Sequence, residues 1–120
     1  MRFLSVFDPT NRDQPTIRKD HPRLSGSELE AVLRYLDAGV MVLRTTAMEK
    51  DLLDPTAELG PRMSSFTDGE WIWDESVPFY VEKHGLSPGA DFLNYCVARS
   101  WIPRKPTQDE KNEALRLILG

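Results

Sequence analysis

The chain has 120 residues, of which 40 % are hydrophobic and 28 % charged, a balance typical of one globular domain and not of a disordered segment. Fifteen Lys and Arg against nineteen Asp and Glu give a net charge of −4, which excludes a dedicated nucleic-acid binder because that function needs a basic face. No run approaches the roughly 20 apolar residues of a membrane span. A single cysteine cannot form an internal disulfide. We therefore expect a cytoplasmic protein of one domain, residues 1–120, without membrane contact.

The first third of the chain is expected to hold an extended arm, one helix and one strand. Prolines and clustered basic residues predict that 1–24 is an extended N-terminal arm, with a short strand at 3–7. Apolar residues at i, i+3, i+4 and i+7 then predict a helix over 27–38. Gly39 follows where a left-handed C-cap is common. The apolar run 40–43 has no helical spacing, so we interpret it as a buried strand.

A hairpin over 63–74 is the clearest local signal. Asp68 and Gly69 form the pair that a two-residue type I′ turn prefers, because both central positions of that turn need a positive φ. Such a turn places Phe66 opposite Trp71 on one face of the ribbon.

The rest of the chain predicts helices. One spans 76–84 and ends at Gly85, the next opens at Ser87 with Cys96 on its apolar stripe, and the last follows Thr107. Two capping boxes are expected, Ser27 with Glu30 and Thr107 with Glu110. The predicted fold is α+β: a small antiparallel sheet of three or four strands packed with about four helices.

No group of residues is typical of catalysis, metal binding or phosphate binding. The histidines, His21 and His84, do not accompany a motif that exposes a nucleophilic serine, and with Cys96 they lack the close spacing of a zinc site. The glycines stand singly and form no phosphate loop. We expect no enzymatic activity, no metal and no cofactor, and interpret Cys96 as a buried structural thiol. A small enzyme or ligand-binding protein stays open as an alternative.

Acidic residues concentrate between residues 47 and 92, where ten acids against three bases give a local charge of −7. Two tryptophans adjoin these acids, and an aromatic anchor surrounded by charge is typical of a protein-binding surface. Alternatively, both tryptophans face the core and the acids only keep the opposite face soluble. The residues expected to bind a partner are Glu49, Asp51, Asp54, Asp68, Glu70, Trp73, Asp74, Glu75 and Tyr80.

Three short motifs resemble a group of small bacterial proteins. Residues 67–73 read TDGEWIW, 78–81 read PFYV and 84–88 read HGLSP. They are similar to the TDGxWxW hairpin, the (Y/F)YV helix motif and the HGxxP turn of that group, and the resemblance covers about residues 27–101. Some of its members look like immunity proteins, which protect a cell from a secreted toxin. The resemblance implies an antitoxin that binds and inhibits a cognate toxin. The acidic charge of the chain suits a toxin with a basic active-site groove. Another protein-interaction adaptor is the alternative.

Overall fold

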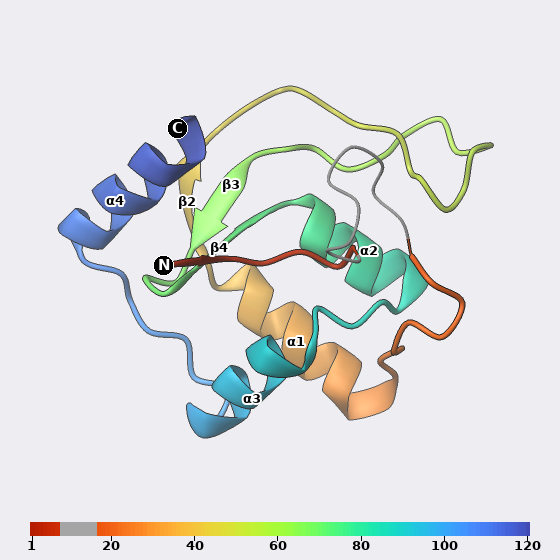
Figure 1. The fold of residues 1–120 in the computed structure, drawn as a ribbon, viewed down its shortest axis with the longest axis horizontal. Coiled ribbons are helices and arrows are strands. Elements are labelled where there is room, and N and C mark those ends of the chain that lie inside the picture. The colour runs from red at the N-terminus through yellow and green to blue at the C-terminus, as the bar shows by residue number, and fades with distance from the viewer. Residues whose placement is uncertain (8–16) are drawn as a thin grey trace.

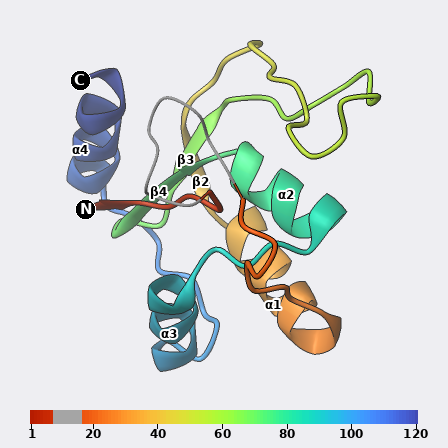
Figure 2. The ribbon, with the colours of Figure 1, turned by 45° about the vertical axis from the view of Figure 1, so that its right-hand side comes forward.

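The computed structural model describes residues 1–7 and 17–120. Its strands are β1 (Arg2–Phe3), β2 (Val40–Leu43), β3 (Ser65–Thr67) and β4 (Trp71–Asp74), and its helices are α1 (Gly26–Asp37), α2 (Ser76–His84), α3 (Ala90–Ala98) and α4 (Gln108–Leu119). The strands form one sheet in the order β1-β4-β3-β2. Figures 1 and 2 place α4 on one side of this sheet and α1 and α2 on the other. The expected α+β fold is confirmed.

The sheet is mixed, which corrects the expectation of a wholly antiparallel one. β1 runs parallel to β4, with Arg2 opposite Trp71, whereas β2–β3 and β3–β4 are antiparallel. β1 is also shorter than the strand expected at 3–7. Its partner lies some seventy residues away, so no local pattern in the sequence could set its direction. β2 is an edge strand and is half-buried instead of buried, because only β3 pairs with it.

The described parts of the predicted N-terminal arm pack against the domain. The side chains of Leu4 and Leu24 are buried in the core. Leu24 N–H donates to the carbonyl oxygen of Gly85 at 2.7 Å, and Ser87 N–H donates to that of Pro22 at 3.0 Å. The extended backbone expected here therefore pairs with the turn that follows α2. Residues 8–16 of the predicted arm lie outside the described residues.

The core lies between the sheet and the helices, and both hairpin tryptophans belong to it. Trp71 and Trp73 are 5 % and 2 % exposed, and both rings lie edge-on to Phe92, with centroids 5.3 and 6.4 Å away. Aromatic rings packed in this way contribute more than any other side chains to a small core. Gly39 lies so close to this layer that a Cβ atom there would be 2.3 Å from Trp73 Cζ2. The expected left-handed C-cap at Gly39 is wrong, because Ala38 caps α1 in a right-handed conformation. The contact with the indole explains why a glycine stands at this position.

One predicted capping box forms and the other does not. Thr107 Oγ1 accepts a hydrogen bond from Glu110 N–H at 3.1 Å, and the Glu110 carboxylate accepts one from Thr107 N–H at 2.9 Å. The expected box at Ser27 is wrong, because α1 begins at Gly26 and places Ser27 inside the first turn. At the end of α2, Gly85 adopts the predicted left-handed conformation, with φ 67°.

The predicted hairpin forms with a longer turn. Phe66 lies opposite Trp73, two residues beyond its expected partner Trp71, so the two-residue type I′ turn is wrong. The Asp68 carboxylate accepts hydrogen bonds from the N–H groups of the second and third residues after it, at 2.9 and 2.8 Å. This Asx turn closes the loop through a side chain. Only Gly69 within the turn needs a positive φ, of 100°.

Candidate functional site

The residues expected to bind a partner separate into a buried and an accessible group. Asp51, Asp68, Trp73 and Tyr80 are between 1 % and 3 % exposed. Glu49 and Glu70 are exposed, and Asp54, Asp74 and Glu75 are half-buried. The expectation that the first four side chains face a partner is therefore corrected, because a surface partner cannot reach them.

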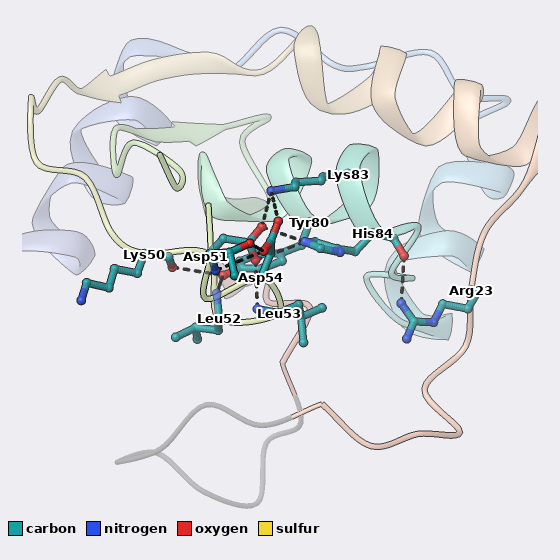
Figure 3. Close-up of polar contacts among 10 residues, drawn as sticks. Arg23, Lys50, Asp51, Leu52, Leu53, Asp54, Tyr80, Lys83 and His84 are labelled. Atoms are coloured by element: carbon teal, nitrogen blue, oxygen red, sulfur yellow. Dashed lines mark hydrogen bonds and ion pairs between the residues drawn. The ribbon is translucent and has the colours of Figure 1, made fainter. Parts of the chain in front are cut away.

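Asp51 is buried because α2 supplies its partners (Figure 3). Lys83 Nζ donates to Asp51 Oδ2 at 2.7 Å, and His84 Nε2 lies 2.9 Å from the same oxygen. Leu53 N–H donates to Oδ1 at 2.9 Å. Burial alone would raise the pKa of Asp51, but the hydrogen bonds from Lys83, His84 and Leu53 outweigh it and lower the pKa to about 2. The carboxylate is therefore charged at neutral pH and ties its own loop to the end of α2.

The segment tied in this way is the 47–62 loop, which projects beyond α2 in Figure 1. The Tyr80 hydroxyl accepts a hydrogen bond from Leu52 N–H at 2.9 Å. At the base of the loop, Glu49 N–H donates to the carbonyl oxygen of Pro61 at 2.9 Å. The exposed apolar side chains of the loop are Met48, Leu52, Leu53 and Leu59. Because the loop is fixed from inside, these side chains are presented in a preset arrangement, which lowers the entropy cost of binding.

Asp68 is a second buried carboxylate with a structural role. Its Oδ2 accepts hydrogen bonds from the hydroxyls of Tyr35 at 2.6 Å and Tyr95 at 2.9 Å. Burial and then the bond to Asp68 raise the pKa of Tyr35, while burial is the main cause that raises the pKa of Tyr95 to about 12. Both hydroxyls therefore remain protonated donors, and Asp68 joins the hairpin to α1 and α3.

Other acids of the segment are also engaged within the molecule. Lys83 Nζ lies 3.4 Å from Asp54 Oδ2, and Arg104 Nη1 lies 3.3 Å from Glu70 Oε1. Asp74 was expected to be exposed but accepts hydrogen bonds from the Ser76 N–H, at 2.9 Å, and from the Ser76 hydroxyl. Much of the −7 charge of the segment is thus neutralised or used in turns.

Two of the remaining acids of the segment line one groove, together with an acid from the end of α1. The groove has a volume of about 550 Å³ and lies between the end of α1, β3, α2 and the 47–62 loop. Asp37, Glu75 and Glu82 contribute carboxylates, Arg62 contributes the one basic side chain of the lining, and half-buried Phe79 contributes apolar surface. Among the described residues, none of these three carboxylates has an ion-pair partner. The lining therefore combines an apolar surface with a net charge of −2.

Of the expected binding residues, only Glu75 and the buried Trp73 belong to this groove. The sequence did contain a signal for part of it. Glu75, Phe79 and Glu82 are spaced by four and three residues, so they share one face of α2. Asp37 could not be found in this way, because it reaches the groove from the end of α1.

The side chains of His84 and Cys96 are both engaged inside the molecule. The His84 ring is bound to Asp51, and in residues 17–120 no hydroxyl or thiol hydrogen-bonds to it. Cys96 is 0 % exposed, as predicted, and burial raises the pKa of its thiol to about 12. The described residues bring no three His, Cys, Asp or Glu side chains together at a possible metal site.

No helix within the described ranges has both the length and the apolar character to cross a bilayer. A comparison with protein-family models, curated proteins and solved structures finds no match for this chain.

Proposed function

We propose that this protein is a non-catalytic binding protein whose groove docks a basic protein partner. The observation that carries the proposal is the combination of three unpaired carboxylates with an apolar surface in one groove. Apolar contacts in such a site supply the affinity, and the surrounding charges select a partner of opposite sign and speed its approach. The exposed Met48 and Leu59 of the 47–62 loop line the groove and add to its apolar surface.

The most concrete form of the proposal is immunity. The partner is then a bacterial toxin whose active-site groove is basic, and this protein inhibits it by covering that groove. The net charge of −4 and the resemblance to TDGxWxW hairpin proteins support this form. A toxin that acts on nucleic acid needs a basic surface to bind phosphate, and an acidic protein competes for that surface.

The test uses a toxin encoded next to this chain, produced with it and purified separately. Association is measured at low and high salt for the wild type and for the double variant Glu75→Gln/Glu82→Gln. Neutralising both carboxylates should slow association by about threefold to tenfold and flatten its salt dependence. The matched control is Asp109→Asn, an exposed acid on α4 across the sheet from α2, which should associate at the wild-type rate.

The double variant should protect toxin-expressing cells less well than the wild type, and Asp109→Asn should protect them equally well. An association rate that neither the double variant nor added salt changes would refute docking at the groove. A protein that leaves the toxin fully active would refute immunity.

A further inference from the structure

We infer that the groove is built for an arginine side chain of the partner, flanked by apolar residues. The inference rests on the proposed function and names the chemical group that the groove recognises. Its basis is the arrangement of carboxylates around a half-buried aromatic ring.

Two carboxylates lie on either side of that ring along α2. Glu75 precedes Phe79 by four residues and Glu82 follows it by three, and Glu75 already has helical backbone angles. Side chains at this spacing lie on one face, and the two acids are about 10 Å apart along the helix axis. A long cationic side chain can therefore lie along the ring with its charged group beside either carboxylate.

A third carboxylate comes from a different element. Asp37 is the last residue of α1 and lines the same groove. The nearest cation on α2 does not neutralise this lining: Lys83 Nζ lies 5.7 Å from the centroid of the Phe79 ring, but its ion pairs are with Asp51 and Asp54. Arg62 is the one basic side chain of the lining, so the groove keeps a net charge of −2 for an incoming cation.

A guanidinium fits this lining better than an ammonium or a neutral group. It is planar and weakly hydrated, it stacks on aromatic rings, and it can bond two carboxylate oxygens at once. An ammonium is a strongly hydrated point charge and loses more hydration on entering a partly apolar groove. The volume of about 550 Å³ exceeds one side chain, so apolar neighbours of the arginine can contact the exposed Met48 and Leu59, which also line the groove.

The inference can be tested without the partner, by titrating the full chain with short peptides and following backbone amide shifts by NMR. The probes are acetyl-Leu-Arg-Leu-amide and two matched peptides in which lysine or the neutral isostere citrulline replaces the arginine. We expect amide shifts on α2 and the 47–62 loop. Relative to the arginine peptide, the citrulline peptide should bind with about tenfold lower affinity and the lysine peptide with about threefold lower affinity.

Variants of the chain locate the binding. Glu75→Gln/Glu82→Gln should lower the affinity for the arginine peptide by about fivefold, whereas the control Asp109→Asn should leave that affinity unchanged. Equal binding of the arginine and citrulline peptides, shifts confined to another surface, or no shifts at millimolar peptide would overturn the inference. Toxin binding that still depends on Glu75 and Glu82 would then show that the proposed function survives without arginine recognition.

Discussion

Asp51→Asn tests whether a buried carboxylate holds the 47–62 loop in place. The substitution keeps the shape of the side chain but removes the charge that Lys83 and His84 contact at 2.7 and 2.9 Å. The pKa of Asp51 falls from 3.8 to about 2 on folding, which corresponds to about 2 kcal/mol of stabilisation. Because Lys83 is 38 % exposed and solvent screens its charge, we expect a smaller loss, of about 1–2 kcal/mol.

The loss should be read from urea unfolding followed by the fluorescence of the buried tryptophans. It should also depend on pH. The folded-state pKa of Asp51 lies below its unfolded value, so its contribution is present above about pH 4 and disappears as the pH falls through about 2. The difference in unfolding free energy between the wild type and Asp51→Asn should therefore shrink across that interval.

Asp91→Asn is the matched control, because Asp91 also has a cationic partner at 2.9 Å but its side chain is 74 % exposed. Its loss should be under about 0.5 kcal/mol. If both variants unfold at the same urea concentration, the reasoning that burial gives the Asp51 contacts their strength is refuted.

Two further predictions concern the core. Gly39→Ala places a Cβ atom 2.3 Å from Trp73 Cζ2, so thermal unfolding should show a loss of about 1–3 kcal/mol in unfolding free energy. A variant that melts like the wild type would contradict the close packing of Gly39 on the indole. Cys96 is fully buried and the pKa of its thiol is raised to about 12, so a thiol reagent should label it slowly in the native protein and quickly in urea, whereas fast native labelling would place the thiol at the surface.

Signals that act over a few residues were readable from the sequence. The helix over 76–84, its left-handed end at Gly85 and the capping box at Thr107 all formed as predicted. Each depends on backbone groups within one or two helical turns, so neighbouring residues alone determine them. The hairpin was located for the same reason, whereas its register was not, because the side-chain hydrogen bonds of Asp68 replaced the expected backbone turn.

Burial and the partners of each charge were decided by the tertiary structure. The sequence marked residues 47–92 as acidic, but the contacts of Asp51 with α2 determined that it is buried, and the contact of Glu70 with Arg104 joins positions thirty-four residues apart. The direction of β1 likewise came from a strand distant in sequence. Asp37 reaches the groove only because α1 packs against α2. The sequence by itself determined where the helices and the hairpin lie, the end of α2 and the start of α4, because the energetics of these features are short-range. Which carboxylates remain free for a partner depended on packing between elements that no local pattern connects.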